Sequence, residues 1–178
     1  LHEFKSSNIH HLVNHSEAKV LFVDEVIWEG LTETEMPDLH AIIQVNTFKV
    51  LYAVDQKIYD AKVHLNELFG KRYPEAFEPD MINYYEDAPE ELAVINYTSG
   101  TTGFSKGVMT PMNALAGNIL FGLTTNLVFP GCRHVAFLPL AHAYGCAFDF
   151  LACLAAGGHT YLIGRTPSAK ILLKAFAE

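Results

Sequence analysis

The sequence has little positive charge and little cysteine, and each shortage excludes a class of protein. Its 178 residues include 12 lysines and arginines against 20 aspartates and glutamates, which gives a net charge of −8. Nucleic-acid-binding proteins need a basic face, so this balance argues against nucleic acid as a partner. The three cysteines are odd in number and lack CxxC spacing, which indicates free thiols in a reducing compartment rather than a disulfide framework.

Long apolar runs are also missing. The longest apolar region, 114–129, is interrupted by Asn118, Thr124 and Asn126, whereas a membrane-spanning helix needs about 20 predominantly apolar residues. We therefore expect no transmembrane segment. The N-terminus shows no signal peptide either. The expected location is cytoplasmic, with a peripheral membrane association as an option for the parent protein.

Apolar patterning predicts an α/β fold. Half of the residues are hydrophobic, enough for a substantial core. Short apolar runs predict strands, which are expected at 20–23, 41–45, 92–97, 135–138 and 160–163. Helices are expected from a cap at Ser6 or Ser7, at 58–69 with a stop at Gly70, at 112–123, at 144–155 before Gly157, and after a cap at Ser168. This alternation predicts a mostly parallel sheet with helices on both faces.

The stretch 97–108 carries the clearest chemistry. Tyr97-Thr98-Ser99-Gly100-Thr101-Thr102-Gly103-Phe104-Ser105-Lys106-Gly107-Val108 follows a predicted strand and combines glycines, hydroxyl side chains and one lysine. Glycines let the backbone approach a ligand, consecutive N–H groups bind anions, and the lysine adds a mobile positive charge. The stretch is therefore a candidate polyphosphate-binding loop. Its spacing fits neither G-x-x-x-x-G-K-[ST] nor G-x-G-x-x-G, which excludes the two commonest nucleotide loops.

The stretch resembles the signature T-S-G-T-T-G-x-P-K-G of the AMP-forming, adenylate-forming enzymes, a family that includes acyl-CoA synthetases, luciferases and peptide-synthetase adenylation domains. The only departure is Ser105 in place of proline, which removes a φ constraint without removing a reacting group.

A second motif lies downstream. Leu138-Pro139-Leu140-Ala141-His142-Ala143-Tyr144-Gly145 stands between a predicted strand and a predicted helix, where open α/β sheets bind ligands. It resembles the P-L-x-H motif of the same family, and its wording is closest to long-chain fatty acid–CoA ligases. The resemblance implies that His142, and less directly Tyr144, lines the carboxylate pocket.

The resemblance implies a chemistry and a set of binding residues. The family joins a carboxylic acid to ATP, releases pyrophosphate, and passes the acyl group to coenzyme A, with Mg²⁺ as cofactor. Thr98 is the candidate Mg²⁺ contact, because Mg²⁺ prefers oxygen ligands. The positions that would hold the phosphates are Ser99, Gly100, Thr101, Thr102, Gly103 and Lys106, together with Thr98.

The resemblance also predicts the domain organisation. Residues 1–178 are expected to be part of the AMP-binding N-terminal domain, with an acidic, solvated connection at 70–91 before the nucleotide loop 97–108. The family's Y-G-x-T-E motif and C-terminal catalytic lysine have no counterpart, so the C-terminal domain is absent from this sequence. We expect such a fragment of a longer protein to be inactive alone.

Two other readings stay open. The parent protein could be an adenylation domain or luciferase-like enzyme acting on another carboxylate. It could instead be a non-catalytic nucleotide-binding or scaffold protein. A metal site at His10, His11 and His15 is disfavoured. No H-E-x-x-H motif accompanies these histidines, and no further ligand is conspicuous nearby in the sequence.

Overall fold

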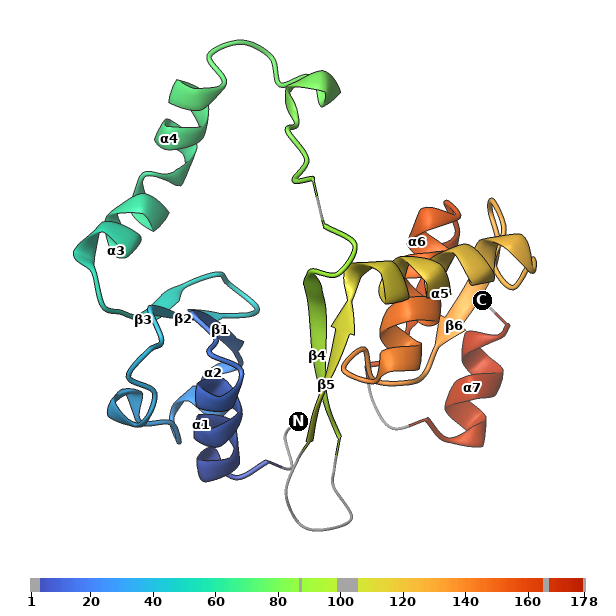
Figure 1. The fold of residues 1–178 in the computed structure, drawn as a ribbon, viewed down its shortest axis with the longest axis horizontal. Helices are drawn as coiled ribbons and strands as arrows, with labels where there is room; N and C mark the ends of the chain where they lie inside the picture. The colour runs from blue at the N-terminus through green and yellow to red at the C-terminus, as the bar shows by residue number, and fades with distance from the viewer. Residues whose placement is uncertain (1–3, 87, 99–105, 165–166, 178) are drawn as a thin grey trace. The chain divides into compact units, whose positions relative to one another are not determined.

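The structure is a computed structural model that describes residues 4–86, 88–98, 106–164 and 167–177. The chain divides into two compact units, Leu1–Tyr84 and Tyr85–Glu178. Both contain helices and strands, so the α/β class is confirmed (Figure 1).

The first unit is built around a three-stranded sheet in the order β1-β2-β3. Strands β1 and β2 are parallel, whereas β2 and β3 are antiparallel. Its elements are α1 (Ser6–His15), β1 (Val20–Val23), α2 (Glu25–Trp28), a 3₁₀ turn (Glu33–Glu35), β2 (Ala41–Gln44), β3 (Val50–Ala53), α3 (Gln56–Val63), α4 (Leu65–Arg72) and a 3₁₀ turn (Pro79–Met81). Its core is made of aliphatic side chains, namely Val13, Val23, Leu31, Met36, Leu39 and Ile42.

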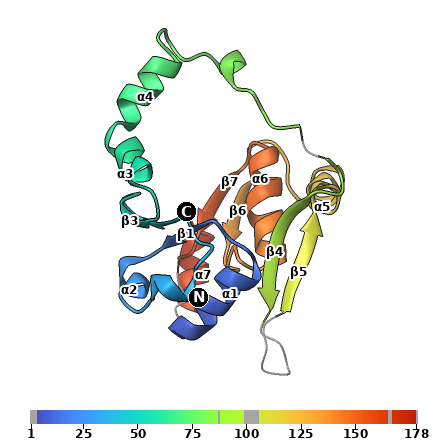
Figure 2. The same ribbon diagram turned by 60° about the vertical axis from the view of Figure 1, so that its left-hand side comes forward.

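The second unit combines an antiparallel hairpin with a parallel pair of strands. Its elements are β4 (Leu92–Thr98), β5 (Lys106–Pro111), α5 (Met112–Thr124), β6 (Arg133–Ala136), a π-helix (Gly145–Ala152), α6 (Cys153–Ala155), β7 (His159–Leu162) and α7 (Ala169–Ala175). Strands β4 and β5 form the hairpin, and β6 pairs with β7 in parallel, with α6 beside them (Figure 2).

Small side chains make up the core of the second unit. Apart from Val128, its buried members are Cys132, Ala152, Cys153 and Ala156. Helix α5 packs against the π-helix at Gly122, where an added Cβ would lie 3.2 Å from the Cβ of Ala152. Small residues at this contact allow the two helices to approach closely.

Several elements differ from the sequence-based expectation. Strands β3 and β5 were not predicted, and each forms an antiparallel pair with its predecessor. The strands thus form three small sheets among the described residues, with two of the four pairings parallel. Strand β5 begins within the signature itself, and its sequence KGVMTP lacks the continuous apolar run by which strands were predicted.

Helix boundaries also differ from the sequence-based expectation. Helix α1 begins at Ser6 after Lys5, and no side chain caps it, so the prediction of a cap at Ser6 or Ser7 is wrong. Helix α4 continues through Gly70 to Arg72, since a single glycine weakens a helix without ending it. Ser168 does cap α7, with its Oγ accepting from the Ile171 N–H at 3.4 Å, and Gly157 (φ +68°) follows α6 as predicted.

Candidate functional site

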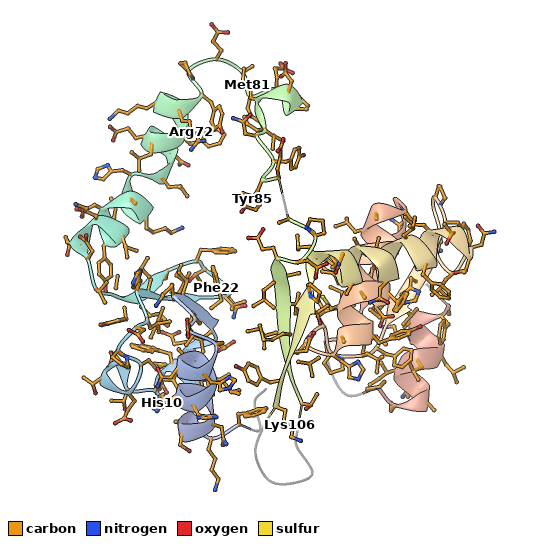
Figure 3. The ribbon with its side chains drawn as sticks, in the orientation of Figure 1. His10, Phe22, Arg72, Met81, Tyr85 and Lys106 are labelled. Carbon is orange, nitrogen blue, oxygen red and sulfur yellow. The ribbon has the colours of Figure 1, made fainter. Side chains whose placement is uncertain are left out.

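The hairpin β4–β5 places the two described ends of the candidate phosphate loop opposite each other. Thr98 pairs with Lys106 and Asn96 pairs with Val108. Directly opposed residues of an antiparallel pair share a face, and so do residues two apart along one strand. Asn96, Thr98 and Lys106 therefore lie on the same face of the hairpin, and Figure 3 labels Lys106 at the start of β5.

The other face of the hairpin is packed tightly. An added Cβ at Gly107 would lie 3.0 Å from Ile95 Cγ2 and 3.2 Å from Tyr97 Cε1. Gly107 thus makes room for the Tyr97 ring, which belongs to its directly opposed partner. This packing holds the strand ends in register at the point where the loop leaves the hairpin.

Both described loop ends are exposed. The Thr98 hydroxyl donates a long hydrogen bond of 3.5 Å to the Lys106 carbonyl, and the Lys106 side chain reaches solvent. A hydroxyl oxygen and an ammonium group are thereby offered to a ligand from one end of the hairpin. The other predicted phosphate-binding residues, Ser99, Gly100, Thr101, Thr102 and Gly103, lie outside the described residues.

His142 stands in a tight turn between β6 and the π-helix. Its N–H donates to the Pro139 carbonyl at 2.9 Å, and its carbonyl accepts from the Cys146 N–H at 2.9 Å. Its ring Nδ1 accepts from the Tyr144 N–H at 3.2 Å. Because Nδ1 is an acceptor, the neutral imidazole carries its proton on Nε2. The exposed ring therefore presents Nε2 as a hydrogen-bond donor.

The turn requires glycine at position 145. An added Cβ at Gly145 would lie 2.7 Å from the Pro139 carbonyl oxygen, which is the oxygen that accepts from His142. Tyr144, which precedes it, is 45% exposed and packs against Phe148 with the rings tilted and their centroids 4.9 Å apart. The π-helix thus begins directly at the motif, and π-helical turns are frequent at functional sites.

The hairpin and the His142 turn are joined by a hydrogen bond. Asn96 Nδ2 donates to the Ala141 carbonyl at 2.9 Å, although the two residues are 45 positions apart. The structure thus links the turn that carries His142 and Tyr144 to the strand that carries Thr98. Asn96 was missed at the sequence level; its only signal was a polar amide next to the apolar run 92–95.

Behind the turn, the π-helix holds a buried acid. Asp149 has 4% of its side chain exposed and pairs through Oδ1 with His134 Nε2 on β6 at 2.9 Å. Its Oδ2 is buried and has no hydrogen-bond partner among the described residues. Close by, burial raises the pKa of the Cys153 thiol, and Cys132 and Asp149 add to the rise. A hydrogen bond from Thr160 opposes it. The Asp149–His134 pair connects the π-helix to β6, and Thr160 connects it to β7 by donating to the Asp149 carbonyl at 3.1 Å.

Within the described residues, no three or more histidines, cysteines, aspartates or glutamates gather into a metal site. His10 instead accepts from the Thr32 N–H at 3.1 Å, and His11 stacks near His15. Nor does any helix in the described parts of the chain have both the length and the apolar character needed to cross a membrane.

Comparison with known proteins decides the family. The sequence profile of the family described as "AMP-binding enzyme" matches residues 2–178. The chain belongs to the AMP-binding enzyme family. This confirms the resemblance of the signature at 98–107, and it accords with the adenylate-forming fold expected from the sequence.

Individual relatives of this chain are named as acyl-CoA ligases. The chain is 29% identical to "Fatty acyl-CoA synthetase A" of Dictyostelium discoideum over 163 residues, which is 89% of this chain and 24% of that protein. It is 31% identical to "Long-chain-fatty-acid--CoA ligase 1" of Cavia porcellus over 151 residues, which is 76% of this chain and 20% of that protein. The chain thus spans about a fifth to a quarter of the length of these relatives.

The fold is also shared with a solved structure. ATP-bound MatB from Rhodopseudomonas palustris superimposes on 99% of this chain with a TM-score of 0.70 at 19% identity, and the match covers 31% of MatB. This likeness shows a common fold.

Proposed function

We propose that the complete protein activates a carboxylic acid with ATP and then passes it to coenzyme A. In the first step a carboxylate oxygen attacks the α-phosphorus of ATP, the bond to pyrophosphate breaks, and an acyl-adenylate forms. In the second step the coenzyme A thiol attacks the acyl carbon, a thioester forms, and AMP leaves with the electron pair of the broken bond. The observation that carries this proposal is the register of β4–β5, which sets Thr98 opposite Lys106 at the ends of the family signature.

The described residues would have separate tasks. The Lys106 ammonium would neutralise β- and γ-phosphate oxygens, which matters because phosphoryl transfer depends chiefly on positioning and charge stabilisation. His142 would donate from Nε2 to a carboxylate or phosphate oxygen, and Tyr144 would line the acyl-adenylate pocket. Mg²⁺ would take the Thr98 hydroxyl as one of its oxygen ligands and would offset phosphate charge.

We further propose that the carboxylic acid is a long-chain fatty acid. The names of the two relatives above and the wording of the motif around His142 support this choice. The test below compares a long-chain fatty acid with other carboxylic acids as substrates.

Pyrophosphate release by the complete protein tests the proposal. Hexadecanoate should support faster release than acetate or benzoate. Lys106→Ala should reduce kcat/KM for ATP by about 100-fold, the size seen when one charge-stabilising donor is removed. Lys170→Ala, an exposed lysine on α7, is the matched control and should behave as wild type.

Two outcomes would count against it. Unchanged ATP kinetics in Lys106→Ala would remove this lysine from the phosphate site. ATP binding without pyrophosphate release for any of the acids would favour a non-catalytic nucleotide-binding protein.

A further inference from the structure

Asn96 makes a contact that its place in the sequence does not explain. It follows the apolar residues Leu92–Ile95 in β4, where asparagine is disfavoured because it fits a pleated, half-buried surface poorly. Asn96 is half-buried as a residue, and its side-chain amide donates to the Ala141 carbonyl at 2.9 Å. A polar group at this position is therefore used for a specific bond between distant segments.

The bond is made to the residue directly before His142. Around His142, the peptide N–H, the peptide carbonyl and the ring Nδ1 are each held by residues close in sequence, namely Pro139, Cys146 and Tyr144. These bonds set the shape of the turn and the orientation of the ring. The Asn96 amide adds an attachment of that turn to β4, the strand that ends at Thr98.

Taking the proposed function as its basis, we propose that Asn96 is a positioning residue that sets the place of His142 relative to Thr98 and Lys106, the described ends of the candidate phosphate loop. Asn96 and Thr98 lie on one face of the hairpin, two residues apart. A donor on Asn96 therefore fixes the Nε2 proton of His142 with respect to Thr98 and Lys106. Asn96 does not touch the reacting atoms and acts through Ala141 and His142.

A positioning role has a distinct kinetic signature. A displacement of about 1 Å at a reacting group costs on the order of 100-fold in rate, while substrate contacts made elsewhere are unchanged. Loss of the Asn96 bond should thus lower the rate of acyl-adenylate formation more than it weakens ATP binding.

The test uses single-turnover acyl-adenylate formation by the complete protein. Asn96→Leu removes the donor at similar volume, and Asn96→Asp is a second variant that keeps size and polarity. Both should slow the reaction by about 10- to 100-fold with less than about a twofold change in KM for ATP. The matched control is Asn113→Leu, because Asn113 Nδ2 donates to Glu90 Oε1 at 2.8 Å in the same unit but away from the turn. It should stay within about twofold of wild type.

A double-mutant cycle separates positioning from general loss of structure. In a His142→Ala background, Asn96→Leu should change the rate by less than about twofold, because the group that Asn96 positions is gone. An equal slowing in both backgrounds, or an equal slowing by Asn113→Leu, would overturn the proposal.

A second readout is independent of the reaction. The ¹⁵N resonances of the His142 ring should shift in Asn96→Leu and remain in place in Asn113→Leu. Unchanged ring resonances in Asn96→Leu would overturn the link even if the protein is an active ligase. If the wild-type protein activates no acid but the resonances shift, the proposed function fails while the structural link between Asn96 and His142 stands.

Discussion

The two units of the chain are stabilised in different ways. In the first, large aliphatic side chains fill the core, and Met36, Leu39 and Ile42 are at most 1% exposed. In the second, cysteines, alanines and glycines bring backbones close together, and the buried polar residue is Asp149. The first core gains from burial of apolar volume, whereas the second gains from close approach. The unit with the candidate site is therefore the one least tolerant of added atoms.

The largest expected effect is on the first core. Ile42→Ala should lower the free energy of unfolding by about 2–5 kcal/mol, because it leaves a cavity at a fully buried site. Urea unfolding followed by the fluorescence of Trp28, the single tryptophan, reports this unit. Ile42→Val should cost only about 0.5–1.5 kcal/mol. Equal losses for the two variants would show that the first core is not filled as described.

A smaller loss of stability is expected when the buried Asp149 of the second unit is changed. Asp149→Asn should cost about 1.5–3 kcal/mol, because it removes a charge-assisted hydrogen bond to His134. The matched control is Glu67→Gln on α4, whose exposed carboxylate pairs with Lys71 and His64, and it should cost less than about 1 kcal/mol. Hydrogen exchange of the amides in β6 measures the loss of stability in Asp149→Asn, and exchange of the amides in α4 measures the loss in Glu67→Gln. A neutral result for Asp149→Asn would mean that the pair does not stabilise β6 against the π-helix.

The small-residue core should respond to one added methyl group. A Cβ at position 158 would lie 2.7 Å from Cys132 Sγ and 2.8 Å from Cys153 Sγ, so Gly158→Ala should cost about 1–3 kcal/mol. Gly117→Ala in α5 meets no atom within 4 Å and should stabilise by up to about 1 kcal/mol. The amide hydrogen-exchange rates of the second unit should therefore rise in Gly158→Ala and fall in Gly117→Ala. Movement in the same direction would contradict close packing at Gly158.

The smallest effect is a pH dependence. Burial raises the pKa of Cys153, so the folded state keeps this proton after the unfolded state begins to lose it near pH 8.5. Stability is then fully present below that pH and falls as the pH rises, by at most about 1.4 kcal/mol per pH unit. Urea unfolding of the second unit from pH 8 to 10 should show a steeper decline in wild type than in Cys153→Ala. If the free energy of unfolding fell equally with pH in wild type and in Cys153→Ala, the Cys153 thiol would not contribute to the pH dependence.

Much of the candidate site could be predicted because it is local in sequence. The signature around Gly100 and Lys106 and the motif around His142 are each contiguous, and the strand before the loop and helix α5 follow from apolar patterning. The antiparallel partners β3 and β5 were missed because hairpin pairing depends on turn geometry, which apolar patterning along one strand does not report. Phe48, with φ +54°, lies in the β2–β3 connection and gave no such signal in the sequence.

The residue types alone determined which chemistry this chain can offer, namely a glycine-rich anion loop with a lysine and a histidine motif. The acidic, cysteine-poor composition argued against a nucleic-acid-binding protein and against a disulfide framework. Tertiary structure alone decided how these parts meet. The Asn96–Ala141 bond and the approach of Gly158 to the Cys132 thiol join residues far apart in sequence. The physical reason is that periodicity and composition constrain neighbours along the chain, whereas such contacts depend on how whole elements pack.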